Sequence, residues 1–304
     1  MSEYPVTEGV KWTPEQRVEW FNKQVIERSY KEEVLERLLP LHKHFDALQY
    51  AALSIDPARY PTYALKSKDW DESKPNVLIT GGVHGYETSG VQGAIGFARE
   101  FAETYKPHFN LLILPCVSPW GYETINRWNP KADDPNRSFC NGGETEESAN
   151  IIRFLKENDF SFLAHFDLHE TTDTDNSRFR PEKAARDGIP NDNWNIPDGF
   201  YTVADTANPE PDFQKAVIEA VKTITHIAPP DENGELIGAK MQQEGVIYYD
   251  MKSLGLCGGM TNAKYTTTTE VYPDSPKATP EICNAAQMAA VCGGLNYLIN
   301  KLSD

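Results

Sequence analysis

The stretch Val77-Leu78-Ile79-Thr80-Gly81-Gly82-Val83-His84-Gly85-Tyr86-Glu87 decides how the rest of this sequence is interpreted. It begins as a short apolar run, rich in β-branched residues and free of charge, which predicts a central strand covered on both faces. The glycines that follow allow the backbone to turn sharply where the strand ends. His84 and Glu87 therefore stand three residues apart at the carboxyl end of a buried strand, where open α/β sheets place their ligand sites.

A histidine and a glutamate are two of the three protein ligands in catalytic zinc sites of the two-His-one-Glu type. Such a pair also occurs by chance, so the interpretation needs a third ligand. The segment 162–170 predicts a second strand, which ends at His169. Since the two strands follow a β-α-β succession, His169 is expected beside His84 and leaves one position of a zinc ion open, as in a catalytic site. His165 shares the same strand face, but we favour His169 because it lies at the strand's end.

Length and charge limit the classes of protein to consider. The chain has 304 residues and a formal net charge of -16, with a sequence pI of about 4.9. This length suits one large α/β domain or two small ones, and we favour one. The acidic balance argues against nucleic acid or an anionic membrane as the partner, and we find no apolar run of the roughly 18 residues that span a bilayer.

The cysteines and the N-terminus suggest where the protein resides. The five cysteines are irregularly spaced and odd in number, which is typical of reduced thiols rather than a disulfide framework. The first residues show neither a basic nor an apolar leader segment. We therefore expect a cytoplasmic protein.

Predicted helices and strands alternate along most of the chain. Strands are expected at 47–55, 60–66, 77–83, 111–115, 160–167 and 264–272, and helices at 13–39, 89–105, 144–157, 213–224 and 280–302. The alternation predicts an α/β fold with a mixed, mostly parallel sheet between helices. The segment 119–143 is loop-like, and the polar segment 171–211 is long for a loop, so it is either functional or contains short elements.

Two polar segments carry further candidate residues. Asn136 and Arg137 form an adjacent amide and guanidinium that suit a carboxylate, which arginine binds with two hydrogen bonds. Taken by themselves, they are more readily explained as a surface turn. Arg127, ten residues earlier, could polarise a carbonyl and stabilise its oxyanion. These positions predict a ligand that carries a free carboxylate.

The β-prone run 266–272 contains one acid, Glu270, among small polar or apolar residues. Beside a metal it could act as a general base and pass the proton to a leaving amine; alternatively, it is an edge-strand carboxylate facing solvent. Upstream, Tyr248 precedes a glycine-rich stretch and could belong to a mobile flap, with Tyr249 as an equally plausible choice.

Taken in order, these motifs resemble the zinc metallocarboxypeptidase family of carboxypeptidase A over roughly residues 47–302. The family's His-x-x-Glu falls on His84 and Glu87, and its later histidine on His169. The resemblance implies a single domain with a mixed sheet of eight strands between helices. We expect this catalytic domain at 46–304, after a helical extension at 1–45.

The resemblance also implies roles for the other candidates. Arg127 would contact the substrate carbonyl and Glu270 would be the catalytic base. Asn136, Arg137 and Tyr248 would hold the terminal carboxylate. The expected activity is a zinc-dependent metallocarboxypeptidase that hydrolyses C-terminal peptide bonds with a metal-activated water.

Locally, Asp167-Leu168-His169 with Thr171-Thr172 also resembles the aspartoacylase and succinylglutamate desuccinylase group. That resemblance implies the same metal triad with a different reaction, the cleavage of an N-acyl amino acid. The alternative is therefore a zinc-dependent N-acyl amino acid deacylase. A cluster of acids at 167, 170, 173 and 175 could hold a second metal ion, but we expect one zinc ion and a solvated acidic loop.

Overall fold

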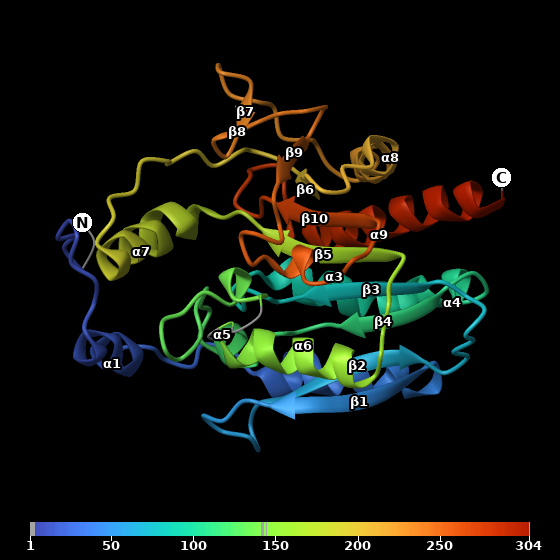
Figure 1. The fold of residues 1–304 in the computed structure, drawn as a ribbon, viewed down its shortest axis with the longest axis horizontal. Helices are drawn as coiled ribbons and strands as arrows, with labels where there is room; N and C mark the ends of the chain where they lie inside the picture. The colour runs from blue at the N-terminus through green and yellow to red at the C-terminus, as the bar shows by residue number, and fades with distance from the viewer. Residues whose placement is uncertain (1–3, 141–142, 144, 304) are drawn as a thin grey trace.

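The computed structural model describes residues 4–140, 143 and 145–303, and its centre is one mixed sheet (Figure 1). The strand order is β1-β2-β4-β3-β5-β10-β6-β9. Four of the neighbouring pairs, β4–β3, β3–β5, β5–β10 and β6–β9, are parallel. The strands span β1 Phe45–Ala52, β2 Pro61–Ser67, β3 Asn76–Gly81, β4 Asn110–Leu114, β5 Ala164–Glu170, β6 Tyr201–Asp205, β9 Val246–Tyr249 and β10 Tyr265–Val271.

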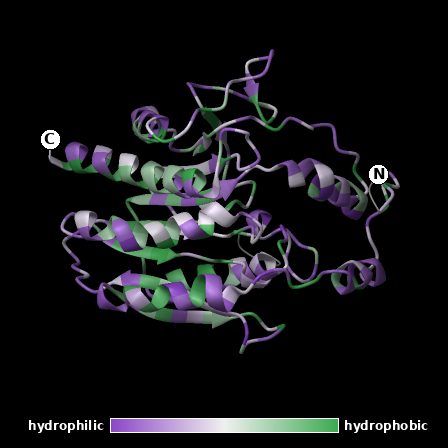
Figure 2. Ribbon diagram, turned by 180° about the vertical axis from the view of Figure 1, so that it is seen from behind, coloured by the Kyte–Doolittle hydropathy of each residue, from purple (hydrophilic) through white to green (hydrophobic). Residues whose placement is uncertain are grey.

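Helices cover both faces of this sheet. On one face lie α3 (Thr88–Glu100), α8 (Pro211–Lys222) and α9 (Pro280–Ser303), which share the larger apolar core with the sheet. On the other face lies α6 (Glu146–Glu157), whose apolar side packs on a second cluster. Figure 2 shows the hydrophobic strands enclosed between the helices. The α/β class and the eight-stranded, mostly parallel sheet expected from the sequence are therefore confirmed.

The central strands are buried on both faces, as the apolar runs of β3 and β4 predict, and β5 is buried although it carries His165, Asp167, His169 and Glu170. All residues of β4 and β5 are buried, and in β3 only Asn76 is partly exposed. The turn after β3 needs glycine at Gly85, because a Cβ there would lie 2.0 Å from the Gly121 carbonyl carbon. Gly90 likewise lets α3 approach β5, since its Cβ would lie 2.3 Å from the Leu168 oxygen. This close packing fixes the chain on both sides of His84 and Glu87.

The N-terminal segment is less regular than expected. The helix predicted at 13–39 is divided into α1 (Pro14–Asn22), a π-helical turn at Lys31–Leu35, α2 (Glu36–Leu38) and a 3-10 turn at Leu39–Lys43. The capping box of Thr13 and Gln16 starts α1. Trp20, Tyr30 and Val34 are buried in the same core as the sheet. The segment thus packs on the sheet, and its status as a separate unit ending at residue 45 stays a prediction.

The polar segment 171–211 does contain short elements that its sequence did not locate. A π-helical turn (Asp175–Phe179) leads into α7 (Arg180–Asp187), and β6 follows. The loop-like segment 119–143 also contains α5 (Pro119–Glu123) and a 3-10 turn at Pro135–Arg137. The remaining elements are α4 (Ala102–Tyr105), β7 (Glu235–Leu236), β8 (Ala239–Lys240) and a 3-10 turn at Cys257–Gly259.

Contrary to expectation, one helix of the described residues, α9, is long and apolar enough to cross a membrane when judged by length and composition alone. Its mean hydropathy is 1.2, and 50% of the apolar window is buried inside the protein. It packs against α3 and α8. A core helix of a soluble protein passes the same test, so this feature is weak evidence for a membrane.

Candidate metal centre and active site

The register of the sheet brings the predicted metal ligands together. β3 and β5 are parallel neighbours, with Thr80 opposite Asp167 and Gly81 opposite Leu168. Their carboxyl ends therefore meet at one edge, where His84, Glu87 and His169 converge. Each of these side chains offers a ligand atom within 4.8 Å of the others, and all three are buried. The geometry thus assembles the triad from two distant segments.

The donor atoms suit a divalent cation. Nδ1 of His84 lies 2.7 Å from Oε1 of Glu87, and Nδ1 of His169 lies 2.6 Å from Oε2. Oε2 is nevertheless buried without a partner in hydrogen-bonding geometry among the described residues. A buried carboxylate oxygen without a hydrogen bond is costly unless an ion binds it. Two imidazoles and one carboxylate are the donor set of a catalytic zinc site, so these residues fit zinc.

The pKa values of Glu87 and His169 show the same demand for positive charge. Burial alone would raise the pKa of Glu87, but the positive charges of His169 and His84 lower it below its usual range. Burial would lower the pKa of His169, yet Asp167 and Glu87 raise it well above its usual value. The carboxylates around His169 therefore favour a positive charge at this position, which a bound cation would supply.

Each metal-facing imidazole is held from behind by an aspartate. Nε2 of His84 lies 3.0 Å from Oδ1 of Asp134, and Nε2 of His169 lies 2.9 Å from Oδ2 of Asp167. A carboxylate on the far nitrogen fixes the ring orientation and leaves Nδ1 free to bind a metal. Asp134 was missed in the sequence, although it stands two residues before Asn136.

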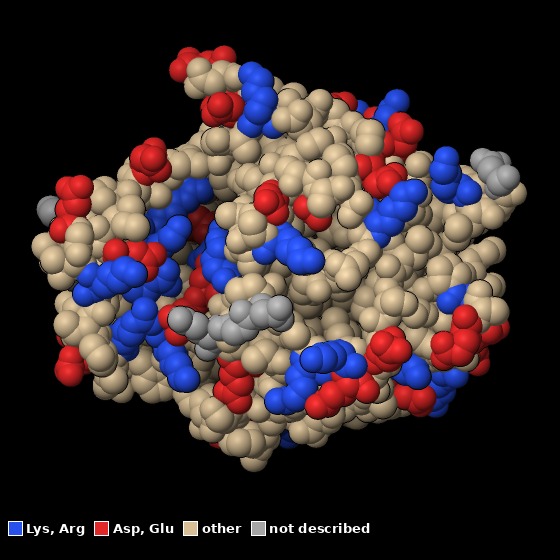
Figure 3. All heavy atoms as spheres, viewed as in Figure 1, with Lys and Arg blue, Asp and Glu red and all other residues tan. Residues whose placement is uncertain are grey.

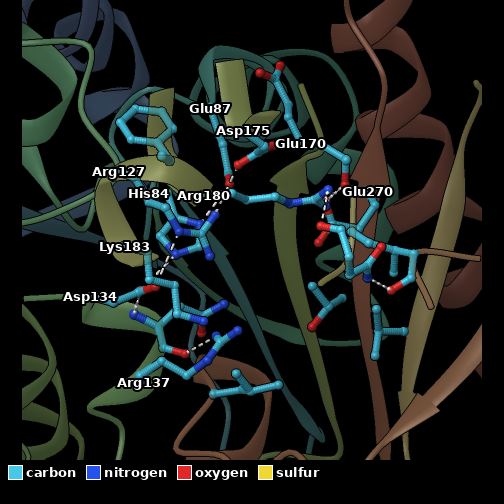
Figure 4. Close-up of a pocket in the computed structure, with 18 of the residues that line it drawn as sticks. His84, Glu87, Arg127, Asp134, Arg137, Glu170, Asp175, Arg180, Lys183 and Glu270 are labelled. Carbon is cyan, nitrogen blue, oxygen red and sulfur yellow. Dashed lines mark hydrogen bonds and ion pairs between the residues drawn. The ribbon is translucent and has the colours of Figure 1, made fainter. Parts of the chain in front are cut away.

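A cavity of about 340 Å³ opens beside the triad. Figure 3 shows Lys and Arg side chains around a hollow on this face, with acidic side chains inside it. Four cations line the cavity, although the chain as a whole is acidic: Arg127, Arg137, Arg180 and Lys183. Figure 4 shows Glu170 and Glu270 on the side of the pocket opposite Arg137 and Lys183. The pocket therefore has a cationic side and an acidic side, and its lining includes His84 and Glu87 of the triad.

Glu270 lies on the acidic side, next to a predicted ligand. β10 runs parallel to β5, and Glu270 is paired with His169. Its Oε2 accepts a hydrogen bond of 2.9 Å from the hydroxyl of Thr171. Burial raises the pKa of Glu270 to about 8. The edge-strand alternative is wrong, because β10 lies between β5 and β6 and Glu270 lines the cavity.

Arg127 reaches the cavity from the loop after α5. Its Nε donates to Oδ2 of Asp134 at 3.2 Å, and Nη1 lies 3.3 Å from the Tyr86 hydroxyl and 3.5 Å from Oδ1 of Asp175. Among the described residues, nothing accepts a hydrogen bond from Nη2. The guanidinium is thus oriented by acids on one side and keeps a donor for a ligand.

Asn136 and Arg137 occupy the 3-10 turn and both line the cavity. Oδ1 of Asn136 accepts a hydrogen bond of 2.8 Å from the backbone N–H of Cys257. Nη1 of Arg137 donates to the backbone carbonyl of Asn136 at 2.7 Å, and the rest of its guanidinium is exposed. Arg137 is therefore exposed, as a residue in a surface turn would be, but it also lines the cavity, which a simple surface turn does not explain.

Tyr248 is not at the pocket. Strand alternation in β9 turns its side chain towards the larger apolar core, against which it packs. The next residue, Tyr249, points the other way and lines the cavity. The choice of Tyr248 is corrected accordingly: the phenol available to a ligand belongs to Tyr249.

The acidic cluster does not converge on a second site. Asp167 faces His169, Glu170 accepts from the backbone N–H of Ser89 at 2.7 Å, and Asp175 accepts from Thr172 N and the Tyr86 hydroxyl. Asp173 instead accepts from the Tyr272 hydroxyl. The four carboxylates therefore have separate partners, and no group of three from this cluster could share an ion among the described residues.

Arg180 and Lys183 were also missed. They lie in α7, whose position could not be read from the polar segment 171–211. Nη1 of Arg180 binds Oδ1 of Asn176 and the backbone carbonyls of Asn193 and Asn195, which fastens the segment after α7 beside the pocket. The sequence offered one indication of these residues, the spacing of three between Arg180 and Lys183, but such spacing is common on solvent-exposed helices.

Residues 73–184 match the family model described as the succinylglutamate desuccinylase/aspartoacylase catalytic domain. This region includes the triad, Arg127, Asn136 and Arg137, but ends before Glu270. Comparison of the sequence with curated proteins gave no significant match.

Solved structures resemble the whole chain. A candidate metallopeptidase from Shewanella amazonensis has 19% identity and a TM-score of 0.66, with 91% of this chain and 99% of that chain covered. A metallo-carboxypeptidase from Burkholderia cenocepacia has 15% identity and a TM-score of 0.57, with 86% of this chain and 68% of that chain covered. Bovine thrombin-activatable fibrinolysis inhibitor, in complex with a tick carboxypeptidase inhibitor, has 12% identity and a TM-score of 0.59, with 93% of this chain and 99% of that chain covered.

The chain has the metallocarboxypeptidase fold. At these identities the structural likeness establishes the fold alone, while the family model adds a sequence match over residues 73–184, which include the candidate metal ligands. Both resemblances expected from the sequence are therefore confirmed.

Proposed function

We propose that this protein is a zinc-dependent metallocarboxypeptidase that hydrolyses C-terminal peptide bonds. The observation that carries the proposal is the convergence of His84, Glu87 and His169 at one sheet edge, with Glu270 beside them. A pure binding protein would not require a partly buried carboxylate of raised pKa next to its metal ligands.

His84, Glu87 and His169 would hold the ion. Zinc at this position supplies a Lewis acid that polarises the scissile carbonyl and makes water more acidic. Asp134 and Asp167 keep the two imidazoles oriented for it. The free Nη2 donor of Arg127 can stabilise the negative charge that develops on the carbonyl oxygen.

Glu270 moves the proton. In its ionised form it removes a proton from the attacking water and then delivers that proton to the nitrogen that leaves. Thr171 holds the carboxylate through its hydroxyl, which in turn contacts the Tyr201 hydroxyl at 2.8 Å. The base is therefore anchored on β10 rather than on a flexible loop.

The cationic side of the pocket selects the substrate. Arg137, Arg180 and Lys183 have no carboxylate partner among the described residues, although the chain carries 45 acidic residues against 29 basic ones. Cations left without an acidic partner in an acidic protein favour an anionic ligand. We assign the free carboxylate of the substrate to Arg137 and Asn136, with Tyr249 as the nearby phenol.

A second candidate is a zinc-dependent N-acyl amino acid deacylase. The match of residues 73–184 to the desuccinylase and aspartoacylase model favours it specifically. This reaction uses the same triad and base and also leaves an amino acid with a free carboxylate. The two candidates differ in what lies on the acyl side of the cleaved bond.

A substrate panel with the zinc-loaded protein separates the candidates. N-blocked dipeptides with a free C-terminus should be hydrolysed, whereas the same peptides with an amidated C-terminus should not. Turnover confined to N-acetyl- or N-succinyl-amino acids would replace the first candidate by the second. Absence of hydrolysis in both classes, with zinc bound, would refute both.

A further inference from the structure

A polar network lies beneath the metal centre, and apart from Asp167 none of its residues has a role in the chemistry described above. Side chains alternate along β5, so His165, Asp167 and His169 share one strand face. Thr80 lies opposite Asp167 on β3, and Cys257 covers both strands from the 3-10 turn. The side chains of His165, Asp167, Thr80 and Cys257 are completely buried. Burying four polar groups in a sheet core is costly unless they satisfy one another.

The Thr80 hydroxyl is the centre of this network. Its oxygen lies 2.6 Å from Oδ1 of Asp167, 3.0 Å from Nε2 of His165 and 3.5 Å from Sγ of Cys257. His165, Asp167 and Cys257 are also near enough to one another to hold a metal ion. However, each of them already contacts the same hydroxyl, so the cluster is explained by hydrogen bonds to Thr80.

The direction of every proton in the network follows from the donors available. An ionised carboxylate only accepts, so Thr80 gives its single proton to Asp167. The hydroxyl oxygen must then accept from Nε2–H of His165 and from the thiol of Cys257. This requires a hydrogen on Nε2 of His165 and a protonated Cys257; burial lowers the pKa of His165 to about 4, which favours the neutral imidazole, and raises the pKa of Cys257.

The network ends at a metal ligand. Oδ2 of Asp167 faces Nε2 of His169, while Oδ1 is held by Thr80. With the carboxylate fixed at both oxygens, His169 keeps its proton on Nε2 and presents the lone pair of Nδ1 to the ion. Partners behind a metal ligand that fix its orientation in this way typically change metal affinity 10- to 100-fold when removed.

We propose that Thr80 is a positioning residue for the metal centre: its hydroxyl, itself held by His165 and Cys257, orients Asp167 and thereby His169. The proposal rests on the proposed function, because it assumes that His169 binds zinc. Without the hydroxyl, one oxygen of Asp167 and Nε2 of His165 would be buried without partners. The carboxylate could then rotate, and His169 would lose its fixed orientation.

The test compares zinc affinity among threonine variants. Thr80→Val keeps the shape and removes the hydroxyl, Thr80→Ala removes it without adding a methyl group, and Thr80→Ser retains it. Thr202→Val is the matched control, because Thr202 is buried in β6 and its hydroxyl has no partner among the described residues. Zinc dissociation constants would be measured by competition with a chromophoric chelator, and urea unfolding would be measured without metal.

We expect Thr80→Val and Thr80→Ala to bind zinc about 10-fold more weakly or worse. Thr80→Ser and Thr202→Val should stay within about 2-fold of the unaltered protein, a difference well under the 1.4 kcal/mol of a tenfold change. If the Thr80→Val and Thr80→Ala proteins unfold more easily but bind zinc with unchanged affinity, the network is only structural and the inference is overturned. If the unaltered protein fails to bind one zinc ion, the proposed function fails first; the two failures are therefore distinguishable.

Discussion

At the scale of single residues, Glu270 connects the fold to the chemistry. Its place opposite His169 on the neighbouring strand follows from the parallel register of β5 and β10. Burial raises its pKa to about 8, whereas a divalent cation nearby favours the ionised form and would lower this value. Because the base acts only when ionised, kcat/KM should decline as the pH is lowered through the pKa of Glu270, and that limb should lie below pH 8.

Replacing Glu270 tests this assignment. Glu270→Gln should bind zinc normally, because Glu270 is not part of the triad, and should lose turnover by about 100-fold or more. The acid limb of the pH profile should vanish in the residual activity. Glu147→Gln is a suitable control, because Glu147 is also a buried carboxyl with a pKa raised by burial, to about 7, and lies outside the pocket. Near-normal activity of Glu270→Gln would show that another group is the base.

The sequence indicated these candidate residues for a physical reason. His84, Glu87 and His169 follow or end strands that are recognisable from their residues, and Glu270 stands in a β-prone run of threonines. By contrast, Asp134 and Tyr249 could not be chosen securely. The first lies in an irregular loop, and the choice between Tyr248 and Tyr249 depends on which face of β9 meets the core. A shift of one residue in a strand reverses the face that each side chain occupies.

At the scale of elements, α7 is a helix beside the pocket that the sequence did not predict. It places Arg180 and Lys183 on the cationic side, and Arg180 ties the helix to the segment around Asn193. Its amphipathic pattern is short and surrounded by prolines and polar residues, so periodicity did not separate it from a loop. The N-terminal segment shows the opposite kind of error: its apolar pattern predicted one continuous helix over 13–39, whereas α1 ends at Asn22.

The cations of α7 should contribute to substrate binding rather than to the chemical step. Lys183→Ala is therefore expected to raise KM several-fold, up to about 10-fold, with little change in kcat. The effect should shrink as salt is added, because the side chain is exposed to solvent. Lys215→Ala, on the exposed surface of α8 and outside the pocket, is the matched control. If Lys183→Ala and Lys215→Ala have equal KM values, Lys183 does not contribute to substrate binding.

At the scale of the whole molecule, most of the sheet was predictable because its strands carry apolar or β-branched runs between recognisable turns. The edge formed by β6 and β9 was less predictable, because these strands are short and partly polar, and they were not recognised as strands. The N-terminal segment could not be assigned to the core, because its buried aromatic residues become part of the larger cluster only after the chain folds back. The fold then explains the site, since three parallel strand ends, β3, β5 and β10, deliver the triad and the base to one edge.

The most direct test of this account is anomalous X-ray diffraction from crystals of the zinc-loaded protein, recorded on both sides of the zinc absorption edge. The account predicts one anomalous peak per chain, bounded by Nδ1 of His84, the Glu87 carboxylate and Nδ1 of His169, and loss of that peak after chelator treatment. A peak at another position, or a zinc-soaked crystal with no peak between these three side chains, would contradict it.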